Sequence, residues 1–140
     1  MTPSKDVVVW TGVRFHISDS PGPPAGPERW AACVLASVSD LPMSSATLAV
    51  EAAIQGRCPL IAVVAPNAEA VHDHVDVLIV AAEADHILTT FHSGPDGVEG
   101  AIWLLHPRCL APGRVYVYSE PDDFFEAALR KLGLLVPLID

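Results

Sequence analysis

The chain has 140 residues, 51% of them hydrophobic, and a mean hydropathy of +0.37. That length suits one domain, and so much apolar material excludes an intrinsically disordered chain. Asp and Glu number 17 against 8 Lys and Arg, which gives a formal net charge of −9. Because the phosphate backbone repels a chain this acidic, we expect no binding to nucleic acid.

Cysteine usage and the N-terminal residues indicate the compartment. Cys33, Cys58 and Cys109 lie far apart without a C-x-x-C pair, which argues against a disulfide scaffold or a zinc ribbon and predicts buried free thiols. No apolar signal segment follows the first residues, and no apolar run is long enough to span a membrane. We therefore expect a soluble, cytoplasmic protein without membrane contact.

The N-terminal part of the chain predicts strands on either side of a proline-rich loop. Residues 6–10 and 13–17 show β-type patterns, and they predict either a hairpin or one bent strand. The prolines of residues 18–29 fix φ and remove amide donors, so this segment is predicted to be an exposed loop. The continuous apolar run at 30–38 is typical of a strand that is buried on both faces.

A helix and a strand are predicted next. Ser44 or Ser45 is expected to cap a helix that reaches Gln55, and Gly56 is expected to end it. The apolar run at 60–64 then predicts a second buried strand.

Two interpretations are open for the segment after Asn67, which is the expected N-cap. Apolar residues recur at helical spacing through residues 68–82, which favours one amphipathic helix. The alternative ends the helix near Val75 and makes residues 77–80 a strand, because β-branched residues are dense there.

The remaining pattern continues the alternation of strands and helices, and it predicts strands at 86–91 and 114–118, helices at 98–105 and 121–132, and an apolar tail at 134–139. Such alternation predicts the α/β class, as a single-domain, Rossmann-like or flavodoxin-like three-layer sandwich with a mainly parallel sheet. Within the domain 1–140, residues 1–17 form the N-terminal β segment, 18–29 the proline-rich loop and 30–140 the alternating core.

A ligand of such a sheet binds outside the carboxyl ends of the strands. The candidate ligand-binding residues near those ends are Ser37, Asp40, Asn67, Asp76, His92, Ser93, Ser119 and Asp122. There is no G-x-G-x-x-G, no P-loop and no G-x-S-x-G motif, so we predict no cofactor and assign no catalytic residue.

The pattern His72-x-His74-x-Asp76 is a second place where chemistry is conceivable. On a helix, His72 and Asp76 are neighbours that could share a metal or form a charge-assisted pair, while His74 points elsewhere. The competing interpretation is a solvated acidic helix face, and no metal is assigned. A zinc site would need more ligands, for which His86 or His92 are the candidates.

His92 follows a strand, at a place where α/β enzymes often hold a general base. Paired with Asp40 or Asp122 it would form an acid–base pair. The alternative is a histidine that only caps the strand end or the next helix.

Three short stretches resemble a family of small uncharacterised bacterial α/β proteins. They are Pro66 to Asp76 with its Val-His-Asp and Val-Asp pairs, Leu88 to His92, and the segment that carries Trp103. The resemblance covers about the middle third of the chain. It implies an α/β fold and no particular activity, and it favours Asp76 and His92 among the candidate residues.

Three functions are compatible with these sequence features. The absence of a strong motif, together with an apolar surface from Phe124 or Phe125 and the tail, favours a non-catalytic accessory or regulatory module that binds a protein partner or a second copy. The polar strand ends favour a small-molecule or nucleotide-binding domain instead. A metal-assisted hydrolase that uses His92 and Asp76 is the third possibility. The sequence favours the first function, without enzyme activity.

Overall fold

The computed structural model describes residues 5–8, 14–18, 30–37, 43–84, 86–93, 97, 100–101, 114–120 and 124–131. The strands are β1 Lys5–Val8, β2 Arg14–Ser18, β3 Trp30–Ser37, β4 Leu60–Val64, β5 Leu88–His92 and β6 Arg114–Glu120. The helices are α1 Met43–Gln55, α2 Ala68–Ala81 and α4 Phe124–Lys131.

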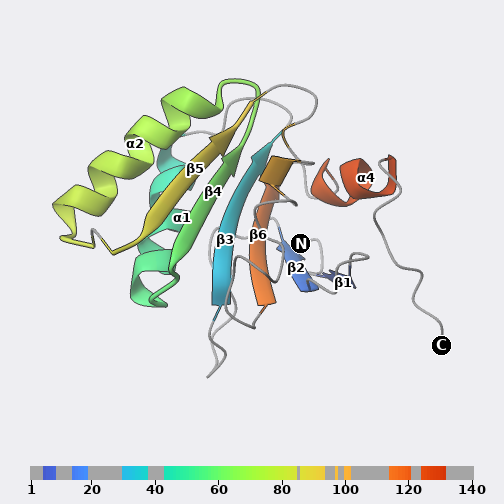
Figure 1. The fold of residues 1–140 in the computed structure, drawn as a ribbon, viewed down its shortest axis with the longest axis horizontal. Helices are drawn as coiled ribbons and strands as arrows, with labels where there is room; N and C mark the ends of the chain where they lie inside the picture. Colours follow the sequence, from blue (N-terminus) through green and yellow to red (C-terminus); the bar gives the residue numbers. More distant parts are fainter. Residues whose placement is uncertain are drawn as a thin grey trace.

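The six strands form one sheet in the order β1-β2-β6-β3-β4-β5 (Figure 1). The β1 strand pairs antiparallel with β2, so the first two strands form the predicted hairpin rather than one bent strand. The other five strands are mutually parallel. The N-terminal segment therefore belongs to the main sheet, and the α/β class with its mainly parallel sheet is confirmed.

The strand order places β6, the last of the described strands along the chain, between β2 and β3. Counted from β3, the strands β5-β4-β3-β6 have the order 3-2-1-4, which is how the Rossmann order 3-2-1-4-5-6 begins, and the next place is taken by β2 of the N-terminal hairpin. β6 and β3 are therefore neighbours in the sheet. The helix after β3 is α1 and the helix after β6 is α4, and these two helices lie on opposite faces of the sheet (Figure 1).

The sheet separates two apolar cores, and the three layers of the prediction are confirmed. Alternate side chains of a strand point to opposite faces, so Leu35 of β3 packs beneath α1 and α2 while its neighbour Val34 packs on the side of α4. Val71 and Val75 of α2 lie in the first core, and Phe125 of α4 lies in the second. Phe125 contacts Phe15 of β2 with ring centroids 5.2 Å apart.

The α2 helix runs unbroken from Ala68 to Ala81, so the single-helix prediction is confirmed and the alternative strand at 77–80 is wrong. Val71, Val75 and Ile79 are all buried, and their helical spacing outweighs the local β-branched density. Asn67 stands at the N-cap position but makes no capping hydrogen bond with its side chain.

The end of α1 corrects two local predictions. The helix begins at Met43, so Ser44 and Ser45 lie inside its first turn instead of capping it. Gly56 does not take the left-handed position after the helix; Arg57 does, with φ of 57°. The amides of Arg57 and Cys58 donate to the carbonyls of Ile54 and Ala53, which is the hydrogen-bond pattern of a Schellman motif.

Several predictions lie outside the described residues. These are the proline-rich loop beyond Ser18, most of the helix predicted at 98–105, and the apolar tail at 134–139. Of the predicted helix, Gly100 and Ala101 are described and are helical. None of the helices in the described part of the chain is long and apolar enough to cross a membrane.

Candidate functional site

The carboxyl ends of β3 and β6 place two predicted site residues on neighbouring strands. Ser37 pairs with Glu120 and Ala36 pairs with Ser119, so Ser37 and Ser119 lie at neighbouring strand ends but point to opposite faces of the sheet. This is the point where the chain turns to opposite faces of the sheet, which is the usual ligand site of an open α/β sheet. Both serines are buried, however, and the Ser119 hydroxyl accepts a hydrogen bond of 3.1 Å from the amide of Phe125. Ser119 therefore serves the first turn of α4.

The other predicted strand-end residues do not join this pair in the described part of the chain. Asn67 and Ser93 are exposed and His92 is half-buried. Asp40 and Asp122 lie outside the described residues, so the structure does not test the acid–base pair predicted for either of them with His92.

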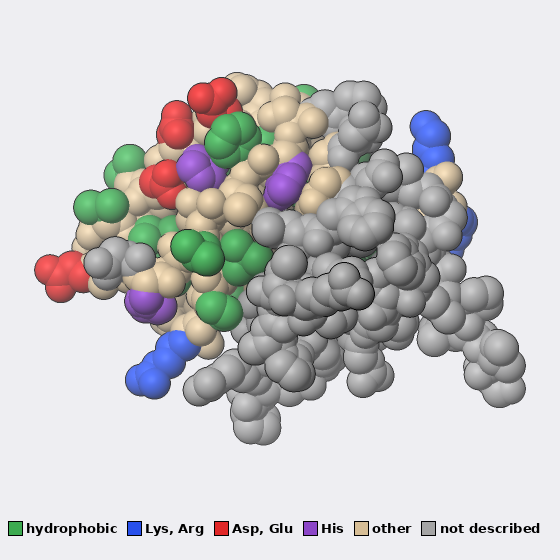
Figure 2. Space-filling view, viewed as in Figure 1, with side chains coloured by type: hydrophobic (Ala, Val, Ile, Leu, Met, Phe, Trp, Pro, Cys, Tyr) green, Lys and Arg blue, Asp and Glu red, His purple; other side chains and the backbone are tan. Residues whose placement is uncertain are grey.

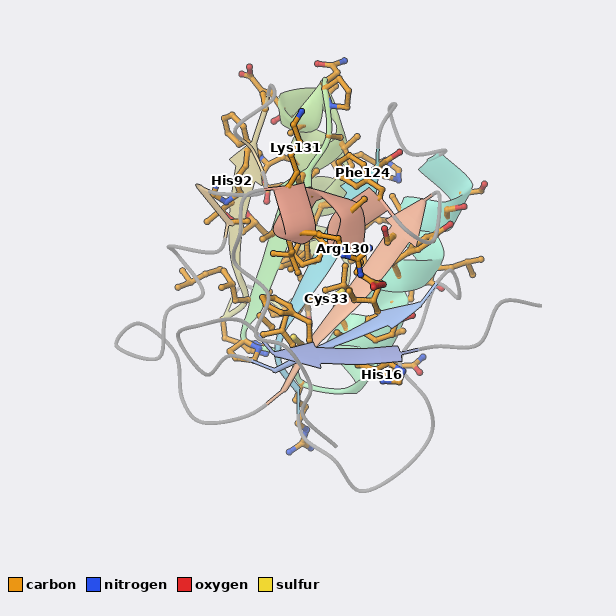
Figure 3. All side chains as sticks on the ribbon, turned by 90° about the vertical axis from the view of Figure 1, so that its right-hand side faces the viewer. His16, Cys33, His92, Phe124, Arg130 and Lys131 are labelled. Carbon is orange, nitrogen blue, oxygen red and sulfur yellow. The ribbon has the colours of Figure 1, made fainter. Side chains whose placement is uncertain are left out.

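His92 lies on β5, at the far end of the sheet from His16 of β2 (Figure 3). Its Nε2 atom is 3.1 Å from the Thr90 hydroxyl. Gly100 gives the ring room, since a Cβ atom there would lie 3.2 Å from Nδ1 of His92. Burial lowers the pKa of His92 below its usual value, which favours the neutral ring.

His92 and Asp76 are not brought together. Side chains alternate along β5, so His92 and Thr90 point to one face of the sheet while Thr89 points to the other, toward α2. Asp76 lies on α2 and bonds to Thr89. His92 and Asp76 therefore lie on opposite faces of the sheet, and the structure does not bring these two side chains into one site.

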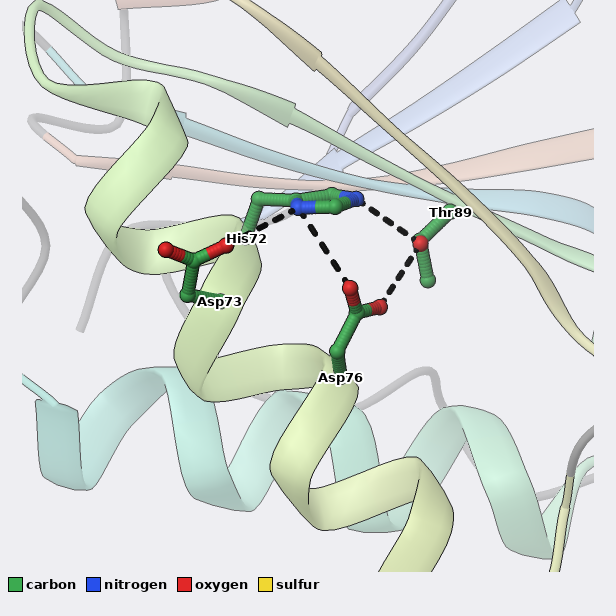
Figure 4. A network of polar contacts seen from close by, with 4 residues as sticks. All are labelled: His72, Asp73, Asp76 and Thr89. Atoms are coloured by element: carbon green, nitrogen blue, oxygen red, sulfur yellow. Dashed lines mark hydrogen bonds and ion pairs between the residues drawn. The ribbon is translucent and has the colours of Figure 1, made fainter.

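A compact polar cluster joins α2 to β5 (Figure 4). The Thr89 hydroxyl donates to Oδ1 of Asp76 at 2.8 Å, and its oxygen lies 2.9 Å from Nε2 of His72. On the other side of the ring, Nδ1 of His72 lies 3.5 Å from Oδ2 of Asp76 and 3.7 Å from Oδ1 of Asp73. The Phe91 ring covers the imidazole with centroids 4.9 Å apart. His72 and Asp76 thus make an organised contact with the sheet, while Asp73 is exposed to solvent and Asp76 is half-exposed.

The hydrogen bonds of Thr89 assign the protonation of the His72 ring. A hydroxyl has one proton, and that of Thr89 goes to the Asp76 carboxylate. The Thr89 oxygen can then only accept from His72, so Nε2 carries a proton. The nitrogen that faces both carboxylates is Nδ1, which is buried and has no hydrogen-bond partner.

The donor atoms of the cluster are of types that could hold a cation. One ligand atom each from His72, Asp73 and Asp76 lies within 4.8 Å of the others, and these types of donor bind divalent metals. Within the described ranges neither His86 nor His92 belongs to this group.

His74 points away from the cluster, as predicted. Its Nε2 lies 2.9 Å from the Thr47 hydroxyl of α1. The spacing of residues on a helix was sufficient to separate it from His72 and Asp76.

Thr89 is the member of the cluster that the sequence did not reveal. Asp73 directly follows His72 in the sequence, and the pattern assigned it no role of its own. A threonine in a strand pattern carries no special signal, and Thr89 is 13 residues from Asp76. One feature of the sequence could have indicated it. Thr89 is a polar residue in the strand that follows the helix with the His72–Asp76 pair, on the side of the strand that faces this helix.

Exposed apolar side chains gather around the same helix and strand. Leu88 and Phe91 of β5 are 70% and 44% exposed, and Val77 and Val80 of α2 are also exposed. Figure 2 shows apolar, acidic and histidine side chains side by side over this part of the molecule. The patch predicted on the last helix is not supported, because Phe125 is buried and Phe124 packs partly against the second core.

Comparison with protein-family models, with curated proteins and with solved structures gave no match to this chain. The resemblance to small bacterial α/β proteins therefore stays a prediction.

Proposed function

We propose that this chain is a non-catalytic α/β module that binds an extended segment of another protein along the free edge of β5. The observation that carries the proposal is the exposure of Leu88 and Phe91 on the last strand of the sheet. Edge strands in monomeric proteins are usually protected by charges, proline or bulges. The β5 sequence, Leu-Thr-Thr-Phe-His, has no lysine, carboxylate or proline, and its pairing with β4 shows no bulge.

The backbone of β5 is oriented to receive another strand. The Leu88 amide donates to the Pro59 carbonyl, and the His92 carbonyl accepts from Ala65, so both residues direct their backbone polar groups toward β4. Because these directions alternate along a strand, Thr89 and Phe91 direct theirs away from β4. No other strand that the structure describes pairs with that side. Addition of a partner strand would satisfy these groups.

The charge of the region favours a basic partner. Residues 58–107 contain no lysine or arginine, and they contain seven carboxylate residues. Glu69, Asp73 and Asp76 lie on α2 beside β5. A second copy would bring the same negative charges to the interface, whereas lysines or arginines flanking an apolar segment would be attracted. The proposed partner therefore contributes an extended apolar segment with basic flanks.

A peptide display experiment tests this function. A library of alternating apolar and variable residues is selected on the full chain and counter-selected on Phe91→Pro, which lacks the outward amide. Phe91→Ala is the matched control, because it loses the ring but keeps the amide. We expect enriched peptides to carry lysine or arginine and to bind wild type. They should bind Phe91→Ala more weakly, because the exposed ring is lost, and they should not bind Phe91→Pro.

Three results would contradict the proposal. One is the absence of any enriched peptide, and another is equal binding to Phe91→Pro. The third is a dimer in light scattering that Phe91→Pro dissociates, since the occupant would then be a second copy. Circular dichroism establishes that each variant is folded.

A second candidate function rests on the ends of β3 and β6. The turn of the chain to opposite faces at this point favours a small-molecule or nucleotide site there. The test is a thermal-shift screen of nucleotides and metabolites with and without Mg²⁺. A ligand at about 100 times its Kd stabilises by roughly 2.7 kcal/mol, which raises Tm by several degrees. A ligand of this site would lose its effect in Ser37→Val.

A further inference from the structure

The Nδ1 atom of His72 is in an unusual position for a histidine nitrogen. It is buried without a hydrogen-bond partner, although its side chain is 15% exposed, and it faces two carboxylates. Nε2 carries the proton that it donates to the Thr89 oxygen. In a neutral ring, Nδ1 then directs its lone pair at the oxygens of Asp73 and Asp76. Two acceptors and a lone pair repel one another unless a positive group lies between them.

We propose that His72, Asp73 and Asp76 bind one divalent transition-metal ion, with Zn²⁺ as the representative. The ligands are Nδ1 of His72 and one carboxylate oxygen each from Asp73 and Asp76. All three proposed ligands belong to α2, so the site does not require the partner segment proposed for β5.

The distances favour a shared metal over a direct ion pair. A charge-assisted N–H···O bond is about 2.7–2.9 Å long. Two ligand atoms that each lie about 2.0–2.1 Å from a tetrahedral zinc are separated by roughly 3.3 Å. The separations of 3.5 and 3.7 Å from Nδ1 to the two carboxylates are close to the second value.

The nitrogen ligand selects the class of metal. Mg²⁺ and Ca²⁺ prefer sites made of oxygen alone, whereas an imidazole with carboxylates suits zinc and its first-row neighbours. Asp73 is exposed and Asp76 is half-exposed, so water can reach the ion and complete its coordination. No lysine or arginine lies in residues 58–107 to compete for the carboxylates.

Thr89 acts as the positioning residue of the site. Metal-bound histidines commonly donate their second N–H to an oxygen, which sets the tautomer and the orientation of the ring. The Thr89 hydroxyl does this for His72 while it also holds Asp76 by donating to Oδ1. One side chain of β5 thus orients two ligands of α2 (Figure 4).

Titration of the metal-free full chain with Zn²⁺ tests the site by calorimetry. We expect one equivalent to bind to wild type, and His72→Gln and Asp76→Asn to remove that equivalent. His74→Gln is the matched control, because His74 lies on the same helix but contacts Thr47. Thr89→Val, which keeps the shape but not the hydroxyl, should weaken binding by about 10- to 100-fold.

Side-chain ¹H–¹⁵N spectra of the histidines provide a second measurement. Zn²⁺ should shift Nδ1 of His72 before any nitrogen of the other five histidines, with Nε2 still protonated. The proposal is overturned if zinc binds Asp76→Asn and wild type equally, or if another histidine responds first. Circular dichroism of the two ligand variants shows that they remain folded.

Discussion

At the scale of single residues, the burial of His92 makes the stability of the protein depend on pH. The ring lies against Gly100 and beside Thr90, and burial lowers its pKa. A lowered pKa means that the unfolded chain binds a proton on this residue at a pH where the folded protein does not. Acid therefore favours the unfolded state, and stability is lost as pH falls below the usual histidine value of about 6.5.

The substitution His92→Gln should reduce this loss. Between pH 7 and pH 5, wild type should lose more stability than His92→Gln, because glutamine takes up no proton in the unfolded chain. Urea unfolding at each pH measures the difference. Thr90→Val keeps the imidazole and its burial, so it should follow the wild-type slope. Parallel pH profiles for wild type and His92→Gln would contradict the stated cause.

Two helices end with the same motif, and in neither motif is glycine at the left-handed position. After α2, Glu83 has φ of 56°, and the amides of Glu83 and Ala84 donate to the carbonyls of Val80 and Ile79. Arg57 occupies the same position after α1, with φ of 57°. A side chain in the left-handed region costs about 1 kcal/mol relative to glycine.

Arg57→Gly and Glu83→Gly should each stabilise the protein. Relief of the left-handed strain exceeds the added entropy of the unfolded chain, so we expect up to about 1 kcal/mol for each, and roughly twice that for the double variant. Thermal and urea unfolding measure the gain. Gly56→Ala is the control, since its Cβ would meet only the Ala52 carbonyl at 3.4 Å and no left-handed conformation is relieved. A lower Tm for Glu83→Gly would contradict the argument.

At the scale of the molecule, the first core encloses two thiols between the sheet and the helices α1 and α2. Cys33 and Cys58 are both buried, as the sequence predicted, while Cys109 lies outside the described residues. Burial raises the pKa of Cys58 to about 11, although a hydrogen bond to the Leu60 carbonyl accompanies it, and burial raises the pKa of Cys33 well above its usual value. Thiolate, the reactive form, is therefore scarce in the folded protein.

In a Cys109→Ser background, the two thiols should react with a disulfide reagent only when the whole domain opens. At pH 8 the thiolate of Cys58 is about one part in a thousand, so labelling should follow the unfolded fraction as urea is raised. Stability should also fall as pH rises above about 9, where the unfolded chain releases thiol protons that the folded protein keeps. Rapid labelling of both thiols without urea would contradict this expectation.

Much of the fold can be predicted from patterns among residues that are close together in the sequence. The strand at 60–64 agrees with β4, and the stripe at Val71, Val75 and Ile79 predicted one helix correctly. Such patterns work because burial of one face acts on residues that are close in the chain. The pair His72 and Asp76 was found in the same way, since residues four apart on a helix are neighbours.

Contacts between residues that are far apart in the sequence could not be predicted from such patterns. The position of β6 between β2 and β3 brings Arg14 beside Arg114, and the contacts of Thr89 with His72 and Asp76 depend on where β5 lies beneath α2. The separation of His92 from Asp76 by the sheet has the same origin. Local periodicity thus specified the elements and one half of the polar cluster. The packing of two cores on one sheet selected which elements meet, because many sheet orders bury similar apolar area and only the assembled chain distinguishes them.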